Sequence, residues 1–247
     1  MSFLLIDVGN SNLKWTMASK SGELSQVHSI PIDSDLDSAW RDCAQPQGIL
    51  VSSVSSEQYK KTLVNVCTKL WGLSPEFLDS PVAGFGITNA YKEPASLGSD
   101  RWAAMVAAFH AVGSAVLVVD AGTALTIDAI DAQGQHLGGL IAPGLALSRK
   151  VLVSATQMDL DEFNPYQATS DFFGCTTEQC ITSGTCHAAS NLIDQAFAQL
   201  STVNTSKKPV CYLTGGDASR LKDKLQCPYH YQPDLVLKGL ALIATAS

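Results

Sequence analysis

The chain has 247 residues, 46% of them hydrophobic, and a formal net charge of −7. This length allows one large domain or two of ordinary size, and the apolar content is ample for a packed core. The acidic balance argues against a nucleic-acid surface, which needs clustered Lys and Arg. No apolar run approaches the length of a membrane span, and no basic leader precedes a long apolar stretch, so we expect no membrane partner and a cytoplasmic protein.

The first expected element is a buried strand that runs into a polar turn. Residues 4–8 are apolar apart from Asp7, and a second strand pattern begins at residue 13. In such a turn the N–H groups of residues 9–11 can point outward together, where an oxyanion can approach. A hairpin whose Asn and Ser only make the turn is the competing interpretation. After Asp7 and Val8, the turn and the start of the second strand consist of Gly9, Asn10, Ser11, Asn12 and Leu13. Lys14 follows and can add a positive charge beside the turn.

Strands and helices then alternate, which predicts an α/β fold. We expect a short helix within residues 33–43, a buried strand over 48–54 that ends in serines, and a helix over 57–70 after Ser56. Residues 84–86 form a glycine loop without the third glycine of a dinucleotide fingerprint.

A helix is expected over residues 103–110, with Ser99 at its N-cap position and Asp100 and Arg101 opening it. An acid in a first turn is ordinarily a favourable partner of the helix dipole. Beside bound phosphates, Asp100 could instead accept the proton of an attacking hydroxyl. Arg101 could clamp a carboxylate or a phosphoryl group.

The strand and turn of residues 4–14 recur at residues 116–128, where Asp120 takes the place of Asp7. The two copies lie nearly half a chain length apart, which predicts two similar halves with their turns facing one another across a cleft. The pattern resembles the actin, hexokinase and heat-shock ATPase superfamily. This resemblance implies duplicated ribonuclease H-like domains, which we expect over residues 1–114 and 115–247.

The second half continues with a glycine-rich strand over 137–144, a helix over 145–155 and a loop over 157–173. A long helix is expected over 177–200, a strand over 209–213, and a final helix over 235–246. In this superfamily's layout, the Thr214-Gly215-Gly216-Asp217 turn would approach the adenosine.

The ordered set of motifs resembles type III pantothenate kinase over nearly the whole chain. The motifs are Asp7-Val8-Gly9-Asn10-Ser11 with Lys14, Tyr91 through Pro94 to Gly98-Ser99-Asp100-Arg101, Asp120-Ala121-Gly122-Thr123-Ala124 with Asp128, and Gly138-Gly139 before Pro143-Gly144. The resemblance implies a homodimer that phosphorylates pantothenate with ATP in the first step of coenzyme A synthesis, using Mg²⁺ and a monovalent cation, K⁺ or NH₄⁺.

The resemblance also implies roles for single residues. Residues 7–14 would bind the ATP phosphates, with Asp7 holding Mg²⁺ through water, and Thr123 would meet the phosphates from the second turn. Asp100 would be the base, and Asp120 would hold the monovalent cation. The pantothenate site would be lined by Tyr91, Gly98, Ser99, Asp100, Arg101 and Thr177, with Thr176 as the alternative for the last. The other functions considered are a catalytically inactive regulator of this fold and a kinase of the superfamily that acts on another hydroxylated substrate.

Overall fold

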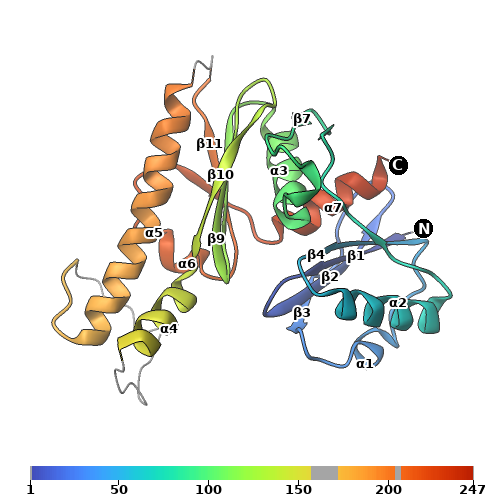
Figure 1. Ribbon diagram of the computed structural model, residues 1–247. Helices are drawn as coiled ribbons and strands as arrows, with labels where there is room; N and C mark the ends of the chain where they lie inside the picture. Colours follow the sequence, from blue (N-terminus) through green and yellow to red (C-terminus); the bar gives the residue numbers. More distant parts are fainter. Residues whose placement is uncertain (1, 157–171, 204–206, 247) are drawn as a thin grey trace. The chain divides into compact units, whose positions relative to one another are not determined.

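The computed structural model describes residues 2–156, 172–203 and 207–246. The chain forms two compact units, one of residues 1–111 with 234–247 and one of residues 112–233 (Figure 1). The expected division placed the last helix, α7 (Leu235–Thr245), in the second half. The structure groups α7 with the first unit because it packs on strands of the first sheet.

The first unit contains a five-stranded sheet in which a hairpin and a parallel strand share the central strand. Its order is β3-β2-β1-β4-β5, with β1 antiparallel to β2 and parallel to β4. The strands are β1 (Ser2–Val8), β2 (Asn12–Ser19), β3 (His28–Pro31), β4 (Gly48–Ser53) and β5 (Glu76–Phe77).

Both faces of this sheet are covered by helices. Alternate residues of β1 point to one face, where Leu4 and Ile6 join a core with Trp40 of α1 (Leu36–Trp40) and Leu63 of α2 (Glu57–Trp71). The predicted cap of α2 is confirmed, since the Ser56 hydroxyl accepts the N–H of Tyr59 at 3.3 Å.

The second unit repeats the strand order of the first, as β10-β9-β8-β11-β12. Here too the first two strands are antiparallel, and the strand on the other side of β8 is parallel to it. The predicted duplication is therefore confirmed. The strands are β8 (Val116–Ala121), β9 (Ala124–Ile130), β10 (His136–Pro143), β11 (Val210–Thr214) and β12 (Tyr229–Tyr231).

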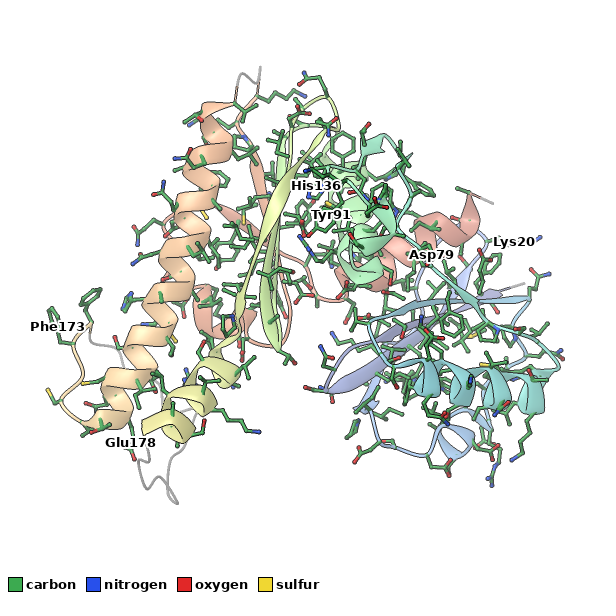
Figure 2. All side chains as sticks on the ribbon, viewed as in Figure 1. Lys20, Asp79, Tyr91, His136, Phe173 and Glu178 are labelled. Carbon is green, nitrogen blue, oxygen red and sulfur yellow. The ribbon has the colours of Figure 1, made fainter. Side chains whose placement is uncertain are left out.

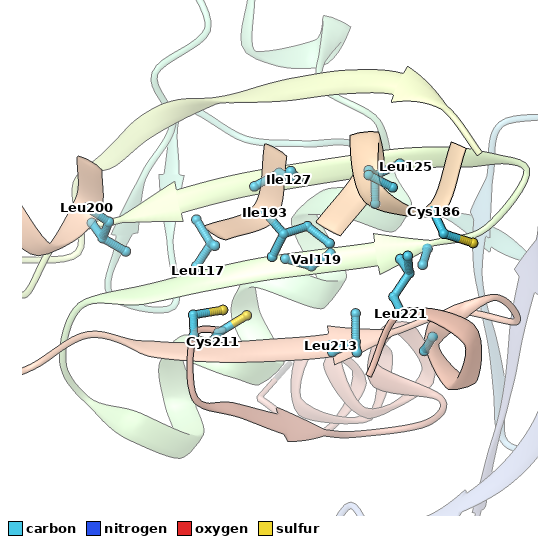
Figure 3. Close-up of a cluster of buried hydrophobic side chains, with 14 of the residues drawn as sticks. Leu117, Val119, Leu125, Ile127, Cys186, Ile193, Leu200, Cys211, Leu213 and Leu221 are labelled. Carbon is cyan, nitrogen blue, oxygen red and sulfur yellow. The ribbon is translucent and has the colours of Figure 1, made fainter. Parts of the chain in front are cut away.

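The helix α5 (Thr177–Thr202) lies along one face of the second sheet. Its Ile193 and Leu200 pack on Leu117 and Ile127 of the strands (Figure 3). The shorter helices α4 (Leu145–Thr156) and α6 (Ala218–Leu221) complete this unit. The loop expected over residues 157–173 lies largely outside the described residues.

A two-stranded hairpin, β6 (Ala83–Gly84) and β7 (Ile87–Thr88), stands where only a glycine loop was expected. Phe85 and Gly86 both have positive φ, 53° and 78°, as the tightest hairpin turns require. The 3₁₀ turn η1 (Pro94–Ser96) and helix α3 (Ser99–Val112) follow. In the part of the chain that the structure describes, no helix is long and apolar enough to cross a bilayer.

Candidate active site

The first polar turn connects β1 to β2 and brings the predicted site residues Asp7, Gly9 and Lys14 together. Asp7 pairs with Lys14 across the antiparallel hairpin and with Ser52 on the parallel neighbour β4. Gly9 closes the turn, because its N–H donates to the carbonyl of Asn12 at 3.0 Å. The expectation that the Gly9 N–H points outward with those of residues 10 and 11 is therefore wrong, since the turn itself uses this donor. Residues 10–12 are exposed, whereas Val8 and Leu13 are buried and anchor the turn in the core.

Lys14 has a partner that sequence reasoning missed. Its Nζ lies 3.1 Å from Oδ1 of Asp234, and both side chains are partly exposed. Asp234 immediately precedes α7 and has a left-handed backbone, with φ 57°. Its place before an apolar helix was readable from the sequence, but its partner lies 220 positions away.

The second group of predicted residues lies at the N-terminus of α3. This helix begins at Ser99, one residue earlier than an N-cap role for Ser99 would place it, and the Gly98 carbonyl accepts the N–H of Trp102 at 3.0 Å. The Ser99 hydroxyl instead lies 3.1 Å from that of Ser52 and accepts the N–H of Ser53 at 3.2 Å. The expected N-cap role of Ser99 is therefore wrong: its hydroxyl fastens α3 to the end of β4.

Gly98 makes room for the Asp100 carboxylate. A Cβ at residue 98 would lie 2.5 Å from Oδ1 of Asp100, so any side chain there would displace the carboxylate. The same oxygen accepts the N–H of Arg101 at 2.8 Å. This bond orients the carboxylate at the N-terminal, positive end of the helix dipole.

Arg101 and Tyr91 form the other part of this group. Arg101 is 7% exposed, and its Nη1 donates to the Tyr91 hydroxyl at 2.8 Å. The guanidinium carbon also lies 5.6 Å from the centre of the Tyr91 ring. The structure thus brings Tyr91, Gly98, Asp100 and Arg101 together beside the end of β4.

The second polar turn, between β8 and β9, is packed against two other glycines. Asp120 pairs with Thr126 and with Thr214, much as Asp7 pairs with Lys14 and Ser52. A Cβ on Gly144 would lie closer than 3.0 Å to the carbonyl oxygens of Gly122 and Thr123. Gly144 thus allows the backbone before α4 to pack closely on this turn, while Thr123 stays exposed.

Gly215 approaches the Asp120 carboxylate, which sequence reasoning did not anticipate. It has φ 96°, and a Cβ there would lie closer than 3.0 Å to both Oδ1 of Asp120 and the Ala121 carbonyl oxygen. Two oxygens therefore face the same glycine. Oxygen ligands are those that hard cations prefer, so the donor set at Asp120 fits a cation.

Asp7 is the only aspartate of the first turn, and no group of three His, Cys, Asp or Glu side chains suited to a metal occurs within the described ranges. Mg²⁺ in phosphoryl-transfer sites is commonly held by one or two carboxylates together with substrate phosphates and waters. A single carboxylate at Asp7 fits that mode of binding.

Two remaining motif residues are placed differently from the rest. Asp128 is buried on β9, where its Oδ1 lies 3.0 Å from Nε2 of the buried His136, an arrangement that joins β9 to β10. At the start of α5, the Thr176 hydroxyl caps the helix by accepting the N–H of Gln179. Thr177 is the first helical residue and is exposed. Since the cap occupies the Thr176 hydroxyl, Thr177 is the better candidate for a ligand.

Two sheets with one strand order, each with an aspartate before its first turn, define a duplicated actin-like α/β fold. A family model described as type III pantothenate kinase matches residues 3–199. A relative of that name from Nitrosospira multiformis is 35% identical over 242 residues, covering 98% of this chain and 90% of its own. This chain belongs to the type III pantothenate kinase family.

Solved structures agree on the fold. A Campylobacter jejuni protein, described as a proposed Baf family transcriptional activator, is 26% identical with a TM-score of 0.60, over 98% of this chain and 96% of that one. The activator of 2-hydroxyisocaproyl-CoA dehydratase from Clostridium difficile, solved with bound ADPNP, has a TM-score of 0.55 at 11% identity. It covers 100% of this chain and 95% of its own, and at this identity the likeness concerns the fold alone.

Proposed function

We propose that this chain transfers the terminal phosphoryl group of ATP to a hydroxyl of pantothenate, forming 4′-phosphopantothenate, the first step of coenzyme A synthesis. Family membership supports the reaction. The observation that carries the residue roles is the group at the start of α3, where the Asp100 carboxylate is oriented next to the Arg101–Tyr91 pair. Phosphoryl transfer needs mainly positioning and charge neutralisation, which these groups supply.

The first turn has the role of phosphate binding in this proposal. Asp7 would hold Mg²⁺ through water, and the bound ion would supply positive charge beside the phosphates of ATP. Lys14 adds a cation beside Asp7, with which it is in register. Residues 8–13 shape the loop, whose donors to ATP are the amides of residues 10 and 11 rather than that of Gly9.

Asp100 has the role of the base that receives the proton of the attacking hydroxyl. Its bond to the Arg101 N–H fixes the carboxylate, so orientation is part of its contribution. Arg101 presents its guanidinium to the anionic substrate, and Tyr91 and Thr177 complete the acceptor site. Gly98 and Ser99 act by shaping it, Gly98 through space and Ser99 through its bonds to β4.

The second turn has the role of binding a monovalent cation and the phosphates. Asp120 holds K⁺ or NH₄⁺, which supplies positive charge near the phosphates when bound, and Thr123 contacts ATP. The exposure of Thr123 and the two oxygens that face Gly215 support these roles. Because ATP is the donor, we also infer a cytoplasmic location, where ATP is abundant.

The decisive experiment follows ADP release and 4′-phosphopantothenate together, in ATP, Mg²⁺ and K⁺, with and without pantothenate. We expect product only with pantothenate, and the variant Asp100→Asn should lower turnover by about 10²–10⁴-fold, the usual contribution of a positioned base. ATP binding by this variant should be unchanged. Nucleotide binding without any product would favour the regulator alternative, and product from a different hydroxylated substrate would favour another kinase specificity.

We further propose that the chain forms a homodimer through an apolar surface of the second unit. β10 is the edge strand of its sheet, and Leu140 and Ile141 on it are 43% and 65% exposed. Exposed apolar side chains continue onto α4, which lines a cavity of about 580 Å³ together with α5. Exposed apolar side chains gathered on an edge strand and on the helix that follows it are typical of an interaction site. The exposed residues are Leu137, Leu140, Ile141, Leu147, Val151 and Leu152.

The oligomeric state tests this surface directly. Ile141→Glu should shift the protein from dimer to monomer in sedimentation velocity. Val82→Glu is the matched control, because Val82 is 66% exposed but lies on the first unit. A dimer that survives Ile141→Glu, or dissociates equally with Val82→Glu, would contradict this interface.

A further inference from the structure

Asn89 follows β7 and lies at the centre of a hydrogen-bonded network. It is 8% exposed. Its Nδ2 donates to the carbonyls of Pro81 and Pro94, at 3.2 and 3.3 Å, and its Oδ1 accepts the N–H of Tyr91 at 3.0 Å. One side chain therefore ties the segment before the β6–β7 hairpin to the 3₁₀ turn beyond it.

The network sets the path of the segment that carries Tyr91. Backbone bonds in the 3₁₀ turn, from Ser96 to Glu93 and from Leu97 to Pro94, span only three residues each. The Asn89 amide instead reaches eight residues back and five residues forward. A buried amide with three bonds is costly to replace, because its partners lose their hydrogen bonds as well.

From Tyr91 the chain of contacts continues to Arg101. The Tyr91 hydroxyl accepts from Nη1 of Arg101, and its ring lies beside the guanidinium, so the two side chains meet through both a hydrogen bond and a ring contact. Figure 2 shows Tyr91 on the segment next to α3. A guanidinium held in this way keeps a fixed orientation of its planar fork.

We infer that Asn89 is a positioning residue of the acceptor site: it fixes the Tyr91 backbone, and Tyr91 in turn fixes the Arg101 guanidinium that receives the pantothenate carboxylate. The inference rests on the proposed function. Preorganised groups bind a substrate better because less ordering is needed on binding. Loss of the Asn89 amide should therefore weaken acceptor binding selectively.

The first test is Asn89→Ala in steady-state kinetics. We expect the KM for pantothenate to rise about tenfold, the loss corresponding to roughly one buried hydrogen bond. The KM for ATP should change by less than about twofold, because the hydrogen-bond partners of the Asn89 side chain are Pro81, Tyr91 and Pro94, which belong to the acceptor-site segment. Asn65→Ala, an exposed asparagine within α2, is the matched control and should leave both constants unchanged.

A double-mutant cycle with Tyr91→Phe separates positioning from a merely structural role. If Asn89 acts through Tyr91, the pantothenate KM of the double variant should be clearly lower than the product of the two single effects predicts. Independent, multiplicative effects would overturn the inference, as would equal rises in the KM values for pantothenate and ATP. Asn89→Ser is the second variant if Asn89→Ala does not fold, and a wild-type pantothenate KM in Asn89→Ser would also overturn it.

Arg101→Lys distinguishes failure of this inference from failure of the proposed function. If Arg101→Lys raises the pantothenate KM while the Asn89 variants do not, only the role of Asn89 is wrong. If Arg101→Lys also has no effect, the proposed acceptor site itself is wrong.

Discussion

Gly239 of α7 packs directly on the backbone of α3, which makes the effect of a single added methyl group calculable. A Cβ at this position would lie closer than 3.0 Å to the O, C and Cα atoms of Ala103. Optimal contacts between such atoms begin at roughly 3.5 Å. Backbone atoms cannot rotate away as a side chain can, so Gly239→Ala must move one helix relative to the other.

The expected net loss is about 2 kcal/mol. Overpacking of a close-packed core costs about 1–3 kcal/mol, and contact with backbone atoms places this variant at the upper end. Replacing a helical glycine with alanine regains about 1 kcal/mol of helix propensity. For a chain of this size, a loss of about 2 kcal/mol lowers Tm by roughly 4–8 °C.

Differential scanning calorimetry of Gly239→Ala and Gly184→Ala tests this reasoning. Gly184 lies inside α5, and apart from the helix's own backbone no atom of the described residues would come within 4 Å of an added Cβ there. Propensity alone should therefore raise the Tm of Gly184→Ala by about 2–4 °C. The two glycine-to-alanine changes have opposite predicted signs. A Gly239→Ala protein at least as stable as the wild type would refute the close packing of α7 on α3.

Three further outcomes concern the phosphate turns. Asp120→Ala should abolish the activation by K⁺, measured as turnover against K⁺ concentration at constant ionic strength; an unchanged K⁺ dependence would count against the cation site. Asp234→Asn should lower the KM for ATP by about two- to fivefold, because a partly exposed ion pair worth up to about 1 kcal/mol no longer competes for Lys14; a raised KM would mean that Asp234 positions the ammonium instead. Gly215→Ala should impair the activation by K⁺ and leave ATP binding at the first turn unchanged, since its Cβ would displace the Asp120 carboxylate. A wild-type K⁺ dependence of this variant would argue against the contact between Gly215 and Asp120.

Local patterns in the sequence predicted most of the elements that carry the site. The long helix expected over residues 177–200 is α5 (Thr177–Thr202), and the expected final helix over 235–246 is α7 (Leu235–Thr245). These elements were predictable because helix periodicity and capping depend on neighbours a few residues apart. The repeated Asp-x-Gly turn likewise predicted the duplicated sheets, whose strand orders are the same.

Predictions that depended on hydrogen-bond partners were less accurate. Ser99 has the residue type and position that are typical of an N-cap, yet its hydroxyl forms hydrogen bonds with Ser52 and Ser53 of a strand nearly 50 residues earlier. Gly9 lies in a turn whose sequence is typical of anion binding, yet its N–H donates to the Asn12 carbonyl and closes the hairpin. A side chain or amide with several possible partners chooses among them by packing, which local sequence does not describe.

The sequence by itself determined the family, most of the order of strands and helices, and the residue types that phosphoryl transfer requires, because these are encoded in short motifs and local periodicity. Only the tertiary structure decided that α7 joins the first unit, that Asp234 partners Lys14, that Gly215 faces Asp120, and that Asn89 holds the Tyr91 segment. Each of these depends on where the packed sheets and helices place groups, and those positions follow from burial of the whole core rather than from adjacent residues.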